Sequence, residues 1–189
     1  MNDTTIEQIR ARIGQLEDGQ RLAFGLLCCE RLLPNFSRFS VQTGFGDSAV
    51  LRKAMDDLWN SLPPSSIPVL TDSRLACELQ APDSEDFETP LASAAMDAAV
   101  AVSLLFSVSD AEDAEAVMQI IQLSRDTVEM YCDTICDLRP GDSDREAKIQ
   151  NHPLVIAELE QQSRDLAAVS NTRSLSSLRP EVAHGSLEL

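Results

Sequence analysis

Apolar residues recur at intervals of three and four along most of the chain, the spacing that places them on one face of an α-helix. Ile6, Ile9 and Ile13 begin this pattern, and Val117 and Ile120 continue it in the second half. No segment alternates apolar and polar residues convincingly over the length of a strand. We therefore expect an all-α fold, with helices over residues 3–15, 18–33, 35–43, 47–61, 72–79, 91–108, 110–138, 143–150 and from 153 onwards.

Prolines, glycines and capping residues set the boundaries between these helices. The residue before a proline avoids the α region, so Pro34 is expected to end the second helix. Asn35 would then cap a short helix, which Gly44 closes in the left-handed conformation. Asp47 is suited to cap the helix that follows.

Residues 91–108 form the most apolar stretch, and Asp97 is their only charge. A helix that is apolar all round is covered on all sides. The pattern therefore predicts a compact bundle of about seven or eight helices around this central segment. Because an unpaired buried carboxylate is costly, we expect Arg31, Arg52 or a backbone amide beside Asp97.

A length of 189 residues favours one domain spanning residues 1–189, with enough apolar positions, 43%, for a sizeable core. Three prolines predict a loop over 61–71, and an acidic run predicts a second loop over 81–90. We expect the tail 180–189 to fray.

The formal net charge of −16 narrows the classes of partner. Nucleic-acid binding depends on Lys and Arg that neutralise phosphates, so this balance argues against nucleic acid and against anionic membranes. The 91–108 segment carries Asp97 and reads as a core helix rather than a membrane span. A second copy of the chain or another protein remains as a partner.

The five cysteines and the polar N-terminus indicate a cytoplasmic protein. The cysteine number is odd, and the first residues do not resemble a secretory signal. Both features predict reduced thiols in the cytoplasm rather than a disulfide framework.

One block of sequence is distinctive enough to suggest a family. It consists of Cys29-Glu-Arg-Leu-Leu-Pro-Asn-Phe36 and Gln42-Thr-Gly-Phe-Gly-Asp47. In these pieces the chain resembles the YjaG family, bacterial proteins of unknown function. Further similar pieces are Leu58-Trp59, Glu85-Asp-Phe87, Ala95-Met-Asp-Ala98 and Asn151-His-Pro-Leu154. The resemblance implies an all-helical cytoplasmic protein and implies no activity.

Two acidic residues in apolar helical surroundings suggest a ligand pocket. Glu30 and Asp97 would share it, and the amides of the glycine-rich turn before residue 48 are a weaker candidate for an anion. Asp47 would compete for those amides as a cap, so structural capping is the favoured interpretation of the turn. No catalytic residue, metal or cofactor is predicted. The candidate pocket residues are Glu30, Asn35, Thr43, Gly44, Gly46, Asp47 and Asp97.

Helical nucleotide pyrophosphatases, which bind magnesium through pairs of carboxylates, offer an alternative. Glu112 and Glu115 match a Glu-x-x-Glu pair, whereas Glu129 and Asp133 miss the second pair by one residue. A solvated helix start explains the cluster more simply, because magnesium needs convergent oxygen ligands.

Other metal and nucleophile chemistries find little support. A di-iron bundle needs two Glu-x-x-His pairs, and His152 and His184 are the only histidines. Cys132 and Cys136 lack the usual zinc spacing, and the cysteines read as small buried hydrophobes. Neither histidine has a neighbouring motif for Cys–His catalysis.

Two hypotheses therefore remain. The first is a non-catalytic helical protein that binds a second copy or another protein through an apolar face. The second is a metal- or small-ligand-binding protein, hydrolytic in its strongest form, that uses carboxylates such as Glu30, Asp97, Glu112 and Glu115. The first is favoured because no set of residues completes a catalytic site.

Overall fold

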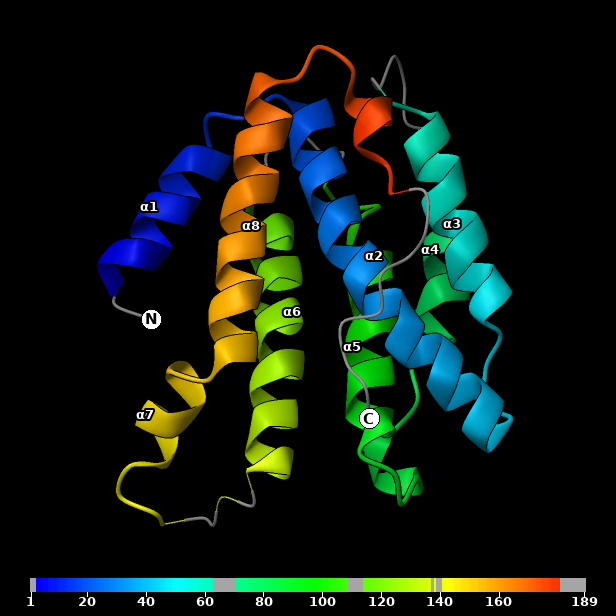
Figure 1. Ribbon diagram of the computed structural model, residues 1–189. Coiled ribbons are helices and arrows are strands. Elements are labelled where there is room, and N and C mark those ends of the chain that lie inside the picture. Colours follow the sequence, from blue (N-terminus) through cyan, green and yellow to red (C-terminus); the bar gives the residue numbers. More distant parts are fainter. Residues whose placement is uncertain (1–2, 63–70, 109–113, 137, 139–140, 181–189) are drawn as a thin grey trace.

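The computed structural model describes residues 3–62, 71–108, 114–136, 138 and 141–180 (Figure 1). Within these ranges the fold is all-α, as expected, with eight α-helices, two short 3₁₀ helices and no strand. In chain order they are α1 (Asp3–Ile13), α2 (Asp18–Thr43), α3 (Ser48–Asn60), α4 (Thr71–Glu78), η1 (Ser84–Asp86), α5 (Leu91–Leu104), α6 (Ala114–Ile135), α7 (Arg145–Gln150), α8 (Pro153–Asn171) and η2 (Leu175–Leu178).

Helix α2 corrects the prediction that Pro34 ends a helix. The helix runs through Pro34 to Thr43, so Asn35 is an interior residue and not a cap. A proline inside a helix leaves the carbonyl four residues earlier without its donor and costs about 3 kcal/mol. Phe36 and Phe39 beyond the proline are fully buried, and their burial offsets that cost. Gly44 ends the helix in the left-handed conformation, with φ 74°, as the sequence predicts.

The core lies where α2, α5 and α6 meet. Alanines on α5 allow close packing, and at Gly25 of α2 an added Cβ would stand 2.9 Å from Leu105 and 3.3 Å from Ile120. The apolar helix is central, but it ends at Leu104 instead of 108. Hydrogen bonds from residues 105–107 to carbonyls three residues earlier tighten the chain there.

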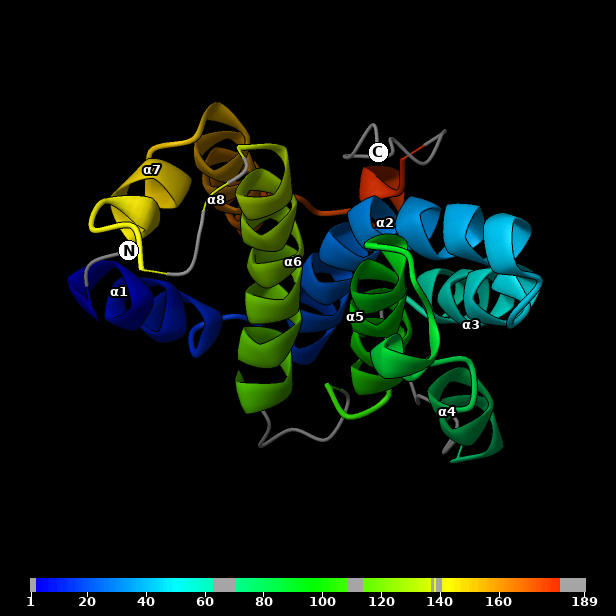
Figure 2. The same cartoon turned by 90° about the horizontal axis from the view of Figure 1, so that it is seen from below.

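The remaining helices flank this centre on two sides. Helices α1, α7 and α8 lie on one side with α6, and α3 and α4 lie on the other, with α2 and α5 between them (Figures 1 and 2). Within the expected loop 81–90 lies the single turn η1. Most of the expected loop 61–71, the cap Asp110 and nearly all of the tail 180–189 lie outside the described residues.

Candidate functional site

Glu30 of α2 is buried against α3. Its carboxylate accepts hydrogen bonds from Arg52 Nη1 (2.8 Å) and Nη2 (3.0 Å) and from Trp59 Nε1 (2.9 Å). Arg52 and Trp59 lie seven residues apart, two turns of α3, so the helix presents both to Glu30. Burial lowers the pKa of Arg52, but its interactions with Glu30 and Asp56 together outweigh burial and raise the pKa. The carboxylate is therefore neutralised within the fold.

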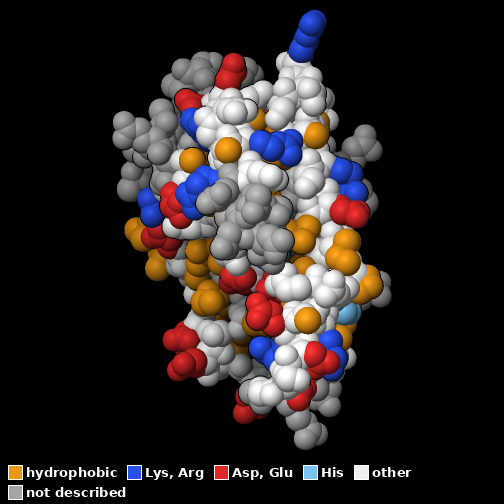
Figure 3. Space-filling view, turned by 90° about the vertical axis from the view of Figure 1, so that its left-hand side faces the viewer, with side chains coloured by type: hydrophobic (Ala, Val, Ile, Leu, Met, Phe, Trp, Pro, Cys, Tyr) orange, Lys and Arg blue, Asp and Glu red, His pale blue; other side chains and the backbone are white. Residues whose placement is uncertain are grey.

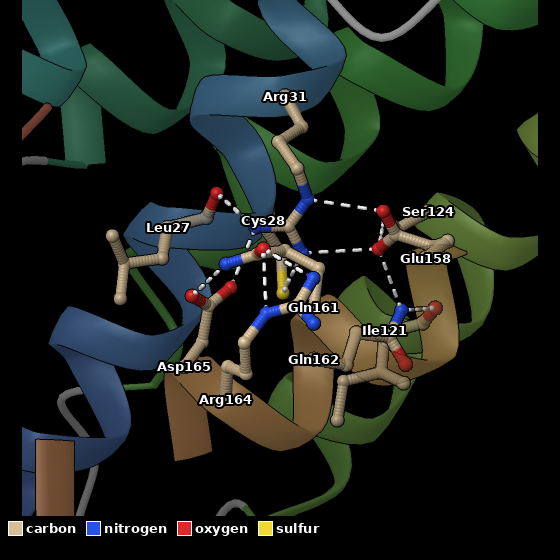
Figure 4. Close-up of polar contacts among 10 residues, drawn as sticks. All are labelled: Leu27, Cys28, Arg31, Ile121, Ser124, Glu158, Gln161, Gln162, Arg164 and Asp165. Atoms are coloured by element: carbon tan, nitrogen blue, oxygen red, sulfur yellow. Dashed lines mark hydrogen bonds and ion pairs between the residues drawn. The ribbon is translucent and has the colours of Figure 1, made fainter. Parts of the chain in front are cut away.

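Arg31, the next residue of α2, points into a second buried cluster on α8 (Figure 4). Its guanidinium donates to Glu158 Oε2 and Oε1 (3.0 Å each) and to Asp165 Oδ2 (2.6 Å). It also donates to the Leu27 carbonyl (3.0 Å) and the Cys28 sulfur (3.6 Å). These five bonds match the five N–H donors of an arginine, so none is left for a ligand.

Neighbouring side chains saturate the two carboxylates of this cluster. Glu158 Oε1 also accepts from Ser124 Oγ (2.7 Å) and Gln162 Nε2 (2.9 Å), and Asp165 Oδ1 accepts from Gln161 Nε2 (2.7 Å). This cluster was not predicted from the sequence. A signal was present, because Glu158, Gln162 and Asp165 fall on the helix face that the buried Val155, Leu166 and Val169 occupy.

A cleft of about 230 Å³ opens over the Arg31 cluster, between α6 and α8. Apolar side chains form part of its wall, and Arg164, 60% exposed, stands at its rim. Two charged residues in its lining, the half-buried Arg31 and the buried Glu158, are already paired with each other at 3.0 Å. The lining residues are Arg31, Val128, Leu154, Ala157, Glu158, Gln161 and Arg164.

Asp97 of α5 faces α6 and has a hydroxyl partner in place of the expected arginine or amide. Thr127 Oγ1 donates to its Oδ2 at 2.7 Å. Arg31 and Arg52 bond elsewhere, and among the described ion pairs none involves Asp97. Burial raises the pKa of Asp97 from 3.8 to about 6, the Thr127 bond opposes the rise, and the nearby Asp126 adds to it. Of the candidate carboxylates inside the core, Asp97 is the one held without a cation.

Glu30 and Asp97 share no hydrogen-bond partner, because one bonds to α3 and the other to α6. Neither lines the α6–α8 cleft, and neither lines a second cleft, of about 330 Å³, between α6 and α7. Asn35 is buried, and its Nδ2 has no partner. The expected pocket of Glu30 with Asp97 therefore remains a hypothesis, with no bond or described cleft in its favour.

The other four candidates form the corner between α2 and α3. Thr43 Oγ1 donates to the Phe39 carbonyl (2.8 Å) and accepts from the Phe45 amide (3.2 Å). Asp47 caps α3 by accepting from the Ala49 amide (2.9 Å).

The amides of this corner are occupied as well. The Gly44 amide donates to the Ser40 carbonyl, and the Asp47 amide donates to Gln80 Oε1 (2.8 Å). Gly46 has φ 70°, and a Cβ there would lie 2.8 Å from Phe36 Cζ. The geometry thus agrees with capping and close packing, since the amides of Gly44, Phe45, Asp47 and Ala49 are engaged.

The buried cysteines provide no activated nucleophile. Burial raises the pKa of Cys28 to about 12, with Arg31 opposing it, and raises the pKa of Cys77 and Cys132 to about 11. Cys136 is exposed, so the prediction that it is buried is wrong.

A contact between Cys132 and His152 was not foreseen. The sulfur lies 3.1 Å from Nδ1, which also accepts from the Leu154 amide (3.3 Å) as the cap of α8. Because Nδ1 acts as an acceptor, the thiol is the donor. The pair therefore fixes the start of α8 and leaves the thiol protonated.

The carboxylates proposed for magnesium are held by arginines. Glu115 pairs with Arg10 (2.6 Å) and Glu129 with Arg125 (3.1 Å). Asp133 pairs with Arg145 (2.6 Å), and this hydrogen bond lowers the pKa of Asp133. Glu112 and His184 lie outside the described residues. Among the residues that are described, no group of three or more His, Cys, Asp or Glu is arranged to hold a metal ion.

Comparison with known proteins places the chain in a class of bacterial helical proteins without an assigned activity. The family described as "Protein of unknown function (DUF416)" matches residues 8–185, and the chain belongs to this family. The uncharacterised YjaG proteins of Escherichia coli K12 and Salmonella typhimurium are 36% and 34% identical over 124 residues, 65% of this chain. The match spans 63% of their own length, less than two thirds.

A crystal structure shares the fold. A DUF416 family protein from Shewanella baltica OS155 has a TM-score of 0.77 and 30% identity, over 89% of each chain. The suggested YjaG resemblance is thus confirmed. Across the part of the chain that is described, no helix has the length and hydropathy needed to span a membrane.

Proposed function

We propose that this protein acts by binding another protein and not by catalysing a reaction. The supporting observation is that three buried carboxylates are paired with arginines. Glu30 is paired with Arg52, and Glu158 and Asp165 are paired with Arg31. A catalytic carboxylate needs a face that is open to substrate. Glu30 and Asp165 line neither described cleft, and Glu158, which lines the α6–α8 cleft, is already held by Arg31, Ser124 and Gln162.

The thiols agree with this proposal. A nucleophilic cysteine needs a lowered pKa and access to substrate. Cys28 and Cys132 are fully buried, with a raised pKa in both cases. The proposed localisation is the cytoplasm, where such thiols stay reduced.

Asp97 supports the alternative function, a ligand site built on carboxylates. It lacks a cation partner among the described contacts, and a carboxyl group with a pKa near 6 can exchange a proton near neutral pH. Its one bonded neighbour is the Thr127 hydroxyl, and Asp97 is 7% exposed, so substrate access is narrow.

The two functions separate in a paired experiment on purified protein. A tagged copy of the protein first captures candidate partner proteins. Each candidate is then produced and purified separately, and its binding to the purified protein is measured by calorimetry. The proposal predicts a saturable complex of fixed stoichiometry. In parallel, elemental analysis and native mass spectrometry test for a retained metal or small molecule. A stoichiometric ligand that is lost in Asp97→Asn, with no reconstituted protein complex, would overturn the proposal in favour of the alternative.

A further inference from the structure

Helix α4 leaves an apolar face uncovered. The helix packs on α5 and its Cys77 is buried, whereas Leu75 and Leu79 are 53% and 69% exposed. Leu79 directly follows the helix, and its amide still donates to the Leu75 carbonyl at 3.0 Å. Because these leucines are four residues apart, they lie one turn apart on the same side. Isolated exposed leucines are ordinary, but a neighbouring pair on a short helix forms a small continuous apolar surface.

The sequence on either side of this apolar pair is acidic. Residues 71–90 contain six acidic residues and one basic residue, Arg74, which gives a formal charge of −5. Of the six, only Glu78 has an ion-pair partner among the described residues, Arg74 at 2.8 Å. The other five are exposed: Asp72, Asp83, Glu85, Asp86 and Glu88.

The acidic segment is fixed to the body of the protein at both ends. Gln80 accepts a hydrogen bond from the Asp47 amide at 2.8 Å, and Phe87 packs on Phe39 and Phe45 with ring centroids 4.9 and 5.4 Å apart. Four residues separate Leu79 from Asp83, so their Cα atoms lie within about 14 Å. The surface therefore exists before a partner binds, and its ordering costs little on binding.

Resting on the proposed function, we propose that this α4 face binds a basic, amphipathic helical segment of a partner protein. We define the face by Leu75 and Leu79 with the carboxylates of Asp72, Asp83, Glu85, Asp86 and Glu88. Leucines one turn apart suit the apolar stripe of a helix, and the surrounding negative charge attracts Lys and Arg that flank such a stripe.

Charge complementarity also decides against a second copy of the chain as the occupant. A symmetric dimer through this face would bring two surfaces of formal charge −5 together. The face on the α1, α7 and α8 side differs, since apolar side chains there stand among charges of both signs (Figure 3). A strongly basic partner therefore has more to gain at the α4 face than at that one.

The test uses a labelled synthetic helical peptide with leucines four residues apart and flanking lysines, and follows its fluorescence anisotropy with the full-length protein. The double variant L75S/L79S changes no charge, and we expect it to weaken binding about tenfold. Val41→Ser is the matched control, because Val41 is 89% exposed on α2 outside the defined face, and it should leave the affinity unchanged. Far-ultraviolet circular dichroism checks that each variant is folded.

A second variant tests whether the carboxylates of the α4 face contribute to binding. Replacing Glu85, Asp86 and Glu88 by their amides should weaken binding several-fold at low salt and reduce its salt dependence. Equal affinity of wild type, L75S/L79S and the charge variant would overturn the inference, because the binding would then be non-specific attraction to an acidic protein. Light scattering that shows a dimer dissociated by L75S/L79S would overturn it too.

The inference and the proposed function fail in different ways. If a purified partner binds L75S/L79S as tightly as wild type, this face is wrong while the binding function stands. If no protein partner is reconstituted and a small ligand is retained, the binding function itself is wrong.

Discussion

Replacing Asp97 by asparagine tests whether a carboxyl group without a cation destabilises the α5–α6 interface. Asparagine has nearly the same shape, and its side-chain oxygen can still accept from Thr127 Oγ1, which lies 2.7 Å from the carboxylate in the wild type. The substitution removes the titration while keeping the packing.

The magnitude follows from the pKa. Folding raises the pKa of Asp97 from 3.8 to about 6, so the folded state holds this proton more tightly than the unfolded chain between these values. The free energy of unfolding therefore falls as pH rises through this window and stays lowered above it. At about 1.36 kcal/mol per pKa unit, the full penalty is about 3 kcal/mol. In Asp97→Asn, the weaker hydrogen bond to Thr127 and the less satisfied side-chain amide lower the stability of the variant by about 1 kcal/mol or slightly more.

We expect Asp97→Asn to be more stable than wild type by about 1–2 kcal/mol near pH 7.5. The advantage should disappear and reverse near pH 4, where the wild-type carboxyl group is protonated. Urea unfolding, followed by circular dichroism over a pH series, measures this difference. The control is Glu88→Gln, an exposed loop carboxylate, for which a change below about 0.5 kcal/mol is expected. A loss of stability in Asp97→Asn at neutral pH, or a difference that does not vary with pH, would refute the reasoning.

Three further substitutions test the clusters and the corner by urea unfolding at neutral pH. Arg31→Met should lower the unfolding free energy by about 3–5 kcal/mol, because the carboxylates of Glu158 and Asp165 remain buried without their cation. A loss below about 1 kcal/mol would contradict a buried network. Trp59→Phe removes one hydrogen bond to a buried carboxylate and should cost about 1–3 kcal/mol. Gly46→Ala should lower the unfolding free energy more than Gly44→Ala. Both glycines have a positive φ, but only at Gly46 would the added Cβ lie against an aromatic ring, 2.8 Å from Phe36 Cζ. Equal losses of stability would argue against that contact.

The helix pattern was predictable because the apolar spacing is local information. The left-handed Gly44 and the cap at Asp47 were also predicted correctly, since each needs only its own neighbours. Pro34 was misjudged for the opposite reason. Its local preference against a helix is outweighed by the burial of Phe36 and Phe39, which depends on the whole core.

The site was harder to predict because charge pairing joins distant positions. Arg31 meets Glu158 across 127 residues, and Cys132 meets His152 across 20. No local pattern states which carboxylate an arginine selects. The polar residues on the buried face of α8 indicated that their side chains are paired, but they did not indicate that the partner is Arg31 of α2.

The adjacent residues Glu30 and Arg31 constrain how α2 is seated. Successive side chains on a helix point about 100° apart, and here the acid meets Arg52 on α3 while the base meets Glu158 and Asp165 on α8. A rotation of α2 by one residue position in one direction would set Arg31 against Arg52. The same rotation in the opposite direction would set Glu30 against Glu158 and Asp165. Misrotated compact states would thus be penalised by burying like charges, and the native packing would be separated from them by a wide energy gap.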